Sequence, residues 1–279
     1  MNDSFITALN TQFATVNWID VIADNMTNVY TPGFREKQVN FKTFLGGAIA
    51  DDYDKKISQG KSTPGTSNEN LFLEGKGFFL VKNAEGKSIY TRLGEFTFDG
   101  EGVYKDRNGN TVQGYILNDK GEIMQGTKSI SADLYQQTAL KGGSLDIPTT
   151  NIKMWIDPNN GKYLGKYDDY EIKGDGTIYG KADGGKRMVP LYRITTRNFH
   201  NSAGLYEFKS GQFIETEASG KPVIGCGEIR SGLLELSNAD FKGNISYYQM
   251  AKLQMEVTNK LISTQKELLQ EALRLVSGS

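Results

Sequence analysis

The sequence predicts an α+β fold in which long N- and C-terminal helices form a coiled-coil core and the chain between them forms an inserted all-β domain. Near both ends, apolar residues recur at steps of three, four and seven, which places them in one stripe along a helix. Between the ends, short alternating runs are separated by glycine-containing turns, as in β-hairpins. The predicted segments are an N-terminal core helix over 1–30, a turn and extended connector over 31–70, a β-rich outer domain over 71–225, a return connector over 226–243 and a C-terminal core helix over 244–279.

The N-terminal helix is predicted from a single main stripe of apolar residues. Residues 2–4 (Asn-Asp-Ser) offer capping groups and early negative charge, and the helix is expected to run to about Asn28. It stops at Thr31, because a residue that precedes a proline is pushed out of the α region. The stripe consists of Ile6, Leu9, Phe13, Val16, Ala23 and Met26.

The C-terminal helix carries two adjacent apolar stripes, a wider face than one partner helix covers. We predict a start between Asn238 and Asn244. A glycine costs roughly 1 kcal/mol inside a helix, so a start near Asn244, or a frayed first turn that contains Gly243, is favoured. Thr258 and Gln265 interrupt the main stripe, and polar groups at such positions fix the register of paired helices. The main stripe consists of Ile245, Tyr248, Met255, Ile262, Leu269, Ala272 and Val276, and the second of Leu253, Val257, Leu261, Leu268 and Leu275.

An assembly interface is the expected use of this surface, because an exposed apolar strip on a protein usually marks one. The two main stripes together with Leu261 form the predicted interface. A chain with helical ends of this kind is built to join neighbouring copies, which suggests a polymer subunit before it suggests an enzyme.

The middle of the chain is predicted to consist of short strands with tight turns. The turn signals include Asp99-Gly100 and Asn108-Gly109. The predicted strands lie at 77–81, 88–92, 95–98, 152–156, 177–179, 188–195 and 205–208.

Composition narrows the function. The chain has 279 residues and a net charge of -1, which gives no reason to expect nucleic acid as a partner. The single cysteine, Cys226, excludes an internal disulfide. No apolar run approaches the ~18 residues of a membrane span, and the N-terminus does not resemble a secretory signal peptide.

Enzyme motifs are missing from the sequence. His200, the only histidine, would need a nucleophile and an orienting acid to act in catalysis. No motif in the sequence indicates either of them. It contains no Walker loop, Gly-x-Ser-x-Gly elbow or His-Glu-x-x-His motif. We therefore predict no catalytic, cofactor-binding or metal-binding residues and no small-molecule substrate. Paired acids such as Asp168 and Asp169 leave one alternative open, a secreted β-rich cell-wall hydrolase.

Three motifs resemble those of the bacterial flagellar rod and hook proteins. Residues 23–35 resemble the family's N-terminal signature, although Asp24 and Thr27 stand where the family usually has Asn and Ala. Residues 73–81 followed by 90–96 resemble its Gly-x-Gly-Phe-Phe strand and Tyr-Thr-Arg-x-Gly-x-Phe segment, and 232–239 resemble the entry to its C-terminal helix. The residues that carry the resemblance are Asn25, Asn28, Thr31, Gly33, Phe34, Gly75, Gly77, Phe78, Phe79, Ser237 and Asn238.

The resemblance implies a structural subunit of the flagellar axial structure. Such a protein would polymerise helically with copies of itself, transmit torque and line the export channel within the basal body. Its expected partners are itself, neighbouring rod and hook proteins, the ring proteins around the rod and the flagellar export apparatus. The rod is the leading interpretation, proximal or distal, and the hook is the alternative.

Export through the flagellar apparatus would explain the expected lack of a cleaved signal. Phe41, Phe44 and Leu45 resemble a short hydrophobic motif by which early substrates meet the export gate. The competing interpretation is that Phe41 and Phe44 pack within the protein rather than meet the export gate.

Overall fold

A computed structural model describes residues 2–44, 47–56, 58–126, 128–144, 147–154, 169–209 and 211–277, and for residues 2, 3, 40–44, 47–55 and 277 it describes the backbone alone. The chain folds into two compact units. The helical unit contains Met1–Tyr30, Arg35–Ser58 and Ser237–Ser279, and the β unit contains Thr31–Phe34 and Gln59–Leu236. The fold is α+β, as the sequence predicts.

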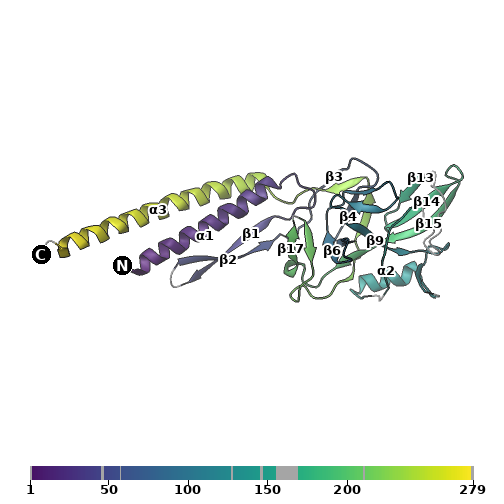
Figure 1. Ribbon diagram of the computed structural model, residues 1–279, viewed down its shortest axis with the longest axis horizontal. Coiled ribbons are helices and arrows are strands. Elements are labelled where there is room, and N and C mark those ends of the chain that lie inside the picture. Colours follow the sequence, from purple (N-terminus) through teal and green to yellow (C-terminus); the bar gives the residue numbers. More distant parts are fainter. Residues whose placement is uncertain are drawn as a thin grey trace. The chain divides into compact units, whose positions relative to one another are not determined.

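The helical unit is a pair of long helices with one hairpin. Its elements are α1 (Asn2–Thr27), β1 (Lys37–Phe44), β2 (Gly47–Lys55) and α3 (Phe241–Ser277). The two helices lie side by side and run antiparallel, and the β1–β2 hairpin packs against α1 (Figure 1).

The β unit is organised around one large antiparallel sheet. Its central path runs β13-β14-β15-β9-β5-β6-β18-β17, and every pairing along it is antiparallel. The elements are β3 (Ser62–Pro64), β4 (Leu71–Glu74), β5 (Phe78–Lys82), β6 (Ser88–Thr91), β7 (Phe96–Phe98), β8 (Tyr104–Asp106), β9 (Thr111–Ile116), β10 (Ile123–Gln125), β11 (Lys128–Ile130), α2 (Ala132–Leu140), β12 (Thr150–Asn151), β13 (Asp169–Ile172), β14 (Thr177–Ala182), β15 (Arg187–Ile194), β16 (Thr196–Asn198), the short 3-10 helix η1 (Ser202–Gly204), β17 (Tyr206–Lys209), β18 (Gln212–Ile214), β19 (Val223–Ile224), β20 (Glu228–Ser231) and β21 (Leu233–Glu235).

Aromatic side chains fill the core of the β unit. Phe79, Phe96 and Tyr104 are completely buried. The rings of Phe79 and Phe96 meet edge to face at 5.3 Å between centroids, an arrangement that aromatic pairs prefer. This core is assembled from predicted strands: a short apolar run predicts β5, alternation predicts β6 and β7, and β15 corresponds to the predicted strand at 188–195. Part of the predicted strand 152–156 lies outside the described residues.

Two predicted connectors contain strands. The segment 31–70 holds the β1–β2 hairpin and β3, where we expected extended chain, and 226–243 holds β20 and β21, which pair with β4 and β3. The strands of three or four residues are too short to show a period in the sequence. In β2 the apolar residues do not alternate, so the sequence gives no strand signal there.

The inserted domain is not all β, because α2 lies within it. Ser131 caps this helix, and its hydroxyl accepts a hydrogen bond from the Leu134 backbone N–H at 3.3 Å. Asp133 adds negative charge in the first turn. These start signals are legible in the sequence, and the prediction of a wholly β domain was wrong.

The C-terminal helix begins at Phe241, within the predicted range but before the favoured start near Asn244. The carboxylate of Asp240 accepts a hydrogen bond from the Lys242 N–H at 3.1 Å, and its carbonyl accepts one from the Asn244 N–H at 2.9 Å. This capping compensates for the cost of Gly243 in the first turn.

Candidate assembly surface

Small and polar residues form the contact between α1 and α3. Ala8 and Thr15 of α1 are buried, as are Ala251 and Thr258 of α3. Side chains of this size allow the two backbones to approach closely. We call this contact the seam.

Polar contacts fix the register of the seam. The Gln265 amide donates to the Ser4 hydroxyl at 2.6 Å, and the Gln12 amide donates to the Asn259 side chain at 2.9 Å. Gln265, one of the polar residues that interrupt the predicted stripe, therefore bonds across the seam.

The apolar stripe predicted on α1 is mostly exposed. Ile6, Phe13, Val16 and Ala23 are exposed, Phe13 to 67%, whereas Leu9 and Met26 are half-buried. The seam instead follows Ala8, Thr15 and Ile22, which recur every seven residues. The stripe that the sequence makes prominent is thus a different line of side chains from the one that pairs the helices.

On α3, the predicted residues divide between the seam and solvent. Ile245, Met255 and Ile262 are half-buried, whereas Tyr248, Leu261, Leu269, Ala272 and Val276 are exposed. All members of the second stripe are exposed: Leu253, Val257, Leu261, Leu268 and Leu275. The helical unit therefore presents a long row of large apolar side chains without cover from the described residues.

Part of this exposure arises because α3 extends beyond the N-terminal end of α1. The first residues of α1 lie opposite Gln265, and α3 continues for twelve more residues, or about 18 Å at 1.5 Å per residue. Leu269 and Val276 follow Gln265 at helical spacing, so they continue the seam beyond the end of α1.

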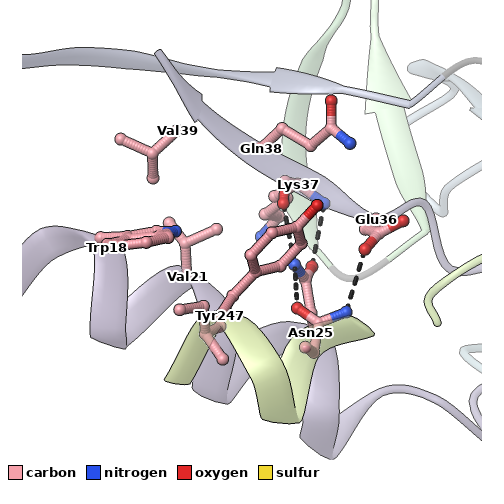
Figure 2. Close-up of a pocket in the computed structure, with 10 residues that line it drawn as sticks. Trp18, Val21, Asn25, Glu36, Lys37, Gln38, Val39 and Tyr247 are labelled. Carbon is pink, nitrogen blue, oxygen red and sulfur yellow. Dashed lines mark hydrogen bonds between the residues drawn. The ribbon is translucent and has the colours of Figure 1, made fainter. Parts of the chain in front are cut away.

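Asn25 and Asn244 join α1, β1 and α3 through buried hydrogen bonds. The Asn25 amide donates to the Lys37 carbonyl at 2.8 Å and accepts from the Lys37 N–H at 2.9 Å, as a paired strand would (Figure 2). It also donates to the Asn244 side chain at 3.2 Å, and Asn244 donates to the Glu36 carboxylate at 2.9 Å. The family-motif residue Asn25 is thus a structural junction.

A 280 Å³ cavity adjoins this junction. Trp18, Val21, Val39 and Tyr247 line it together with the polar side chains of the junction (Figure 2). The Trp18 and Tyr247 rings contact each other at 6.2 Å between centroids, across the seam.

Asn238 holds the entry to α3 against the hairpin. Its side-chain oxygen accepts from the Glu36 N–H at 2.6 Å, and its amide donates to the Lys56 and Ser58 carbonyls at 2.9 and 2.6 Å. Ser237 accepts a hydrogen bond from the Ala239 N–H at 3.1 Å. The other Asn of the N-terminal motif, Asn28, donates to the Asp24 carbonyl at 2.8 Å and so ends α1.

In the β unit, two of the family motifs meet at a buried ion pair. The Arg92 guanidinium lies 3.1 Å from the Glu235 carboxylate, and both side chains are almost fully buried. Arg92 also donates to the carbonyls of Leu73 and Gly75. Both residues lie within the motifs at 90–96 and 232–239, but their pairing could not be predicted, since no periodicity signals a contact between residues so distant in sequence.

Gly33 and Phe34 lie in the β unit as well. Gly33 has a φ of 69°, and a Cβ there would come within 2.9 Å of the Leu93 backbone nitrogen. Phe34 is buried, and its N–H donates to the Thr31 carbonyl at 3.3 Å. Gly75 and Gly77 also have positive φ, directly ahead of the half-buried Phe78 and the buried Phe79. These motif residues build backbone turns and core.

The predicted export motif is only partly described. Phe41 and Phe44 belong to β1, whose side chains there are not described, and Leu45 lies outside the described residues. Its role stays a prediction.

His200 and Cys226 are both exposed. Among the described residues, no group of three or more His, Cys, Asp or Glu side chains is arranged to hold a metal ion. None of the described helices has the length and apolar character that a membrane span requires.

Comparison with known proteins places this architecture among the axial proteins of the bacterial flagellum. Residues 72–180 match the model of the flagellar hook protein FlgE/F/G D1 domain. The flagellar basal-body rod protein FlgG of Bacillus subtilis is 28% identical over 92% of this chain and 92% of its own length, and FlgG of Caulobacter vibrioides is 25% identical over 93% and 94%. The flagellar hook protein FlgE of Borreliella burgdorferi is 31% identical over 70% of this chain and 47% of its own. A solved structure, that of Helicobacter pylori flagellar hook protein FlgE2, is 19% identical over 56% of this chain and 33% of its own, with a TM-score of 0.23.

The chain belongs to the bacterial flagellar rod and hook protein family. It is a structural subunit of the flagellar axial structure.

Proposed function

We propose that this chain is a subunit of the flagellar rod that polymerises helically with copies of itself through α1 and α3. The row of exposed apolar side chains on these helices carries the proposal. Surface of this kind is unfavourable in water, and burial against neighbouring helices would stabilise a polymer. In that polymer the helices of many copies form a coiled-coil core around the export channel, and the β units form the outer layer.

The extent of the alignments with known relatives favours the rod over the hook. The FlgG rod proteins align over nearly the whole of both chains, whereas the hook protein FlgE of Borreliella burgdorferi extends well beyond the aligned part. A rod subunit would transmit torque, and helices shared among many copies resist shear. Rod, hook and ring proteins, and the export apparatus that delivers the subunit without a cleaved signal, are its proposed partners.

Two of the predicted motif residues support this assembly indirectly. Asn25 and Asn238, together with Asn244 outside the motifs, bind backbone and side chains where α1, the hairpin and α3 meet. They would hold the helix pair in one geometry, which a regular polymer requires. Phe41, Phe44 and Leu45 are proposed as the segment that meets the export gate.

Electron microscopy of the concentrated full-length chain tests the proposal. We expect tubes from the unmodified chain and none from Leu261→Glu, because a buried charge is strongly unfavourable in an apolar interface. Gln270→Glu is the matched control: it adds the same charge to α3, on the face with Glu256, Lys260 and Glu267, and should still assemble.

Tube formation by Leu261→Glu would show that the interface lies elsewhere. If the unmodified chain formed no tubes even with rod proteins as a template, the proposed rod function would be wrong. The helical symmetry of the tubes, compared with rods and hooks, would distinguish the two candidate positions.

A further inference from the structure

A second cavity, of 420 Å³, lies within the β unit between α2 and two turns of the sheet. We call it the Arg193 groove. The side chains that matter here are Tyr135, Leu140, Asp175, Arg193, Cys226 and Glu228. None of them belongs to the surface that pairs helices.

Arg193 is buried in this groove with one donor unused. Its Nη2 lies 2.8 Å from an Asp175 carboxylate oxygen, and its guanidinium stacks 5.0 Å from the centroid of the Tyr135 ring. The side chain is only 8% exposed, yet its Nη1 finds no hydrogen-bond acceptor among the described residues. A buried donor without an acceptor is costly, so the groove is suited to an acceptor brought by another molecule.

The charges around Arg193 indicate the kind of acceptor. Asp175 already balances the Arg193 guanidinium. Glu228 adds a further negative charge, which the Arg230 guanidinium, 3.9 Å away and shared with Glu74, balances only in part. An anionic ligand would meet two carboxylates, whereas a neutral backbone carbonyl would satisfy Nη1 and a basic neighbour would suit Glu228. Leu140, which is 72% exposed, offers an apolar contact at the rim. These features fit a peptide segment with a basic and an apolar side chain.

The tip of the β14–β15 hairpin is such a segment. Residues 183–188 (Asp-Gly-Gly-Lys-Arg-Met) are all exposed and present Lys186, Arg187 and Met188 beside a turn. Arg187 and Arg193 stand six residues apart on β15, roughly 20 Å along an extended strand, so the tip is remote from the groove of its own copy.

We propose that the Arg193 groove of one copy binds the β14–β15 tip of a second copy. In this contact a carbonyl of the turn accepts from Arg193, Lys186 or Arg187 faces Glu228, and Met188 contacts Leu140. Tip and groove are different surfaces, so the contact is head-to-tail, and contacts of that type build open helical filaments when the rotation between copies does not close a ring. The proposal deepens the proposed rod function and rests on it for the supply of neighbouring copies.

Cys226 provides the readout, because it is the only cysteine in the chain, is exposed and lines the groove. A cyclic peptide carrying residues 181–190 is added to the dilute full-length chain, and the alkylation rate of Cys226 is measured. We expect saturating peptide to slow alkylation at least tenfold. A peptide with Lys186→Glu and Arg187→Glu should give no protection at the same concentration.

Charge reversal in the groove completes the test. The Glu228→Lys chain should lose protection by the natural peptide and gain protection by the reversed one. Glu217→Lys, the same change at an exposed position of the β unit outside the groove, should behave as the unmodified chain does. Lack of protection by the natural peptide, or equal loss in the Glu217→Lys control, would overturn the proposal.

Assembled material separates this inference from the proposed rod function. Tubes in which Cys226 is protected support both. Tubes in which Cys226 reacts as fast as in the dilute chain overturn the groove contact and leave the axial polymer standing. If no tubes form even with rod proteins as a template, the rod function fails, and the peptide measurement still decides whether the groove binds the tip.

Discussion

The two units of this protein bury opposite kinds of side chain. The β unit encloses large aromatic residues such as Phe79, Phe96 and Tyr104. The seam of the helical unit encloses alanine and threonine, and the helices leave leucine, valine and phenylalanine side chains in solvent. The core of the β unit is thus complete within one chain, whereas the largest apolar side chains of the helical unit remain exposed to solvent.

This difference assigns a role to each unit. Complete burial of a leucine or valine contributes about 1.5–3 kcal/mol, so the second stripe of α3 alone would stabilise a neighbour contact substantially. The stability of the β unit should not depend on assembly. That of the helical unit should rise when copies join.

Removing a large core side chain should show the difference most strongly. Phe79→Ala is expected to lower the free energy of unfolding of the β unit by about 3–5 kcal/mol, because it leaves a cavity in a closely packed core. Phe13→Ala removes the same side chain from an exposed position of α1 and should change the unfolding of the monomer by less than about 0.5 kcal/mol. Urea denaturation of both variants measures this, and equal losses would contradict the comparison.

Enlarging a seam residue should have the next largest effect on stability. Ala251 is completely buried between the helices, so Ala251→Leu is expected to weaken the α1–α3 contact by about 1–3 kcal/mol through overpacking. Hydrogen exchange of α1 amides should accelerate in the dilute chain. Val257→Leu, on the exposed face of α3, should leave that exchange unchanged. Unchanged exchange in Ala251→Leu would mean that the seam is looser than described.

Removal of the Asn238 amide should weaken the junction. Asn238→Ala leaves the Glu36 N–H and the Lys56 carbonyl without their partner, at a cost of about 1–3 kcal/mol. Exchange at the start of α3 should accelerate, while the strands of the β unit keep their protection. Gln249→Ala, on the exposed polar face of α3, is the control. Equal exchange in both variants would show that the motif asparagine is dispensable for folding.

Lowering the pH should reduce the stability of the β unit, and we expect this effect to be smaller than those of the three substitutions above. The pKa values of Asp99, Glu122, Asp169 and Asp175 lie below their usual range. For Asp99 the main cause is the hydrogen bond from Lys105. Burial alone would raise the pKa of Asp175, but hydrogen bonds from Thr177 and the nearby Arg193 outweigh it.

A carboxyl whose pKa is lower when folded contributes stability above its unfolded pKa, about 3.9 for Asp, and loses it as the pH falls through the folded pKa. The urea midpoint of the β unit should therefore fall between pH 5 and pH 2. Asp175→Asn should make this fall shallower, and Asp119→Asn, in an exposed turn, serves as its control. An identical pH dependence in the unmodified chain and Asp175→Asn would refute the assignment.

Much of the fold could be predicted from the sequence. The two terminal helices follow from their apolar periodicity, and β5, β6, β7, β14, β15 and β17 follow from short apolar runs, alternation and turn residues. The β1–β2 hairpin, β20 and β21 could not, because their pairing joins short or non-alternating segments through the backbone. The helix α2 could have been predicted from its cap at Ser131, but we did not predict it.

By itself, the sequence determined the presence of surplus apolar surface at both ends, since periodicity is a local property, and its three motifs carried the resemblance to the flagellar rod and hook proteins. Only the tertiary structure decided which line of α1 faces α3. The stripe of Ile6, Phe13 and Val16 is the more apolar line, yet Ala8, Thr15 and Ile22 form the seam, because the small side chains at two of these positions let the helix backbones approach closely. Contacts between distant residues, such as Asn25 with Asn244 and Arg92 with Glu235, likewise depend on how the chain folds back on itself, which no local pattern encodes.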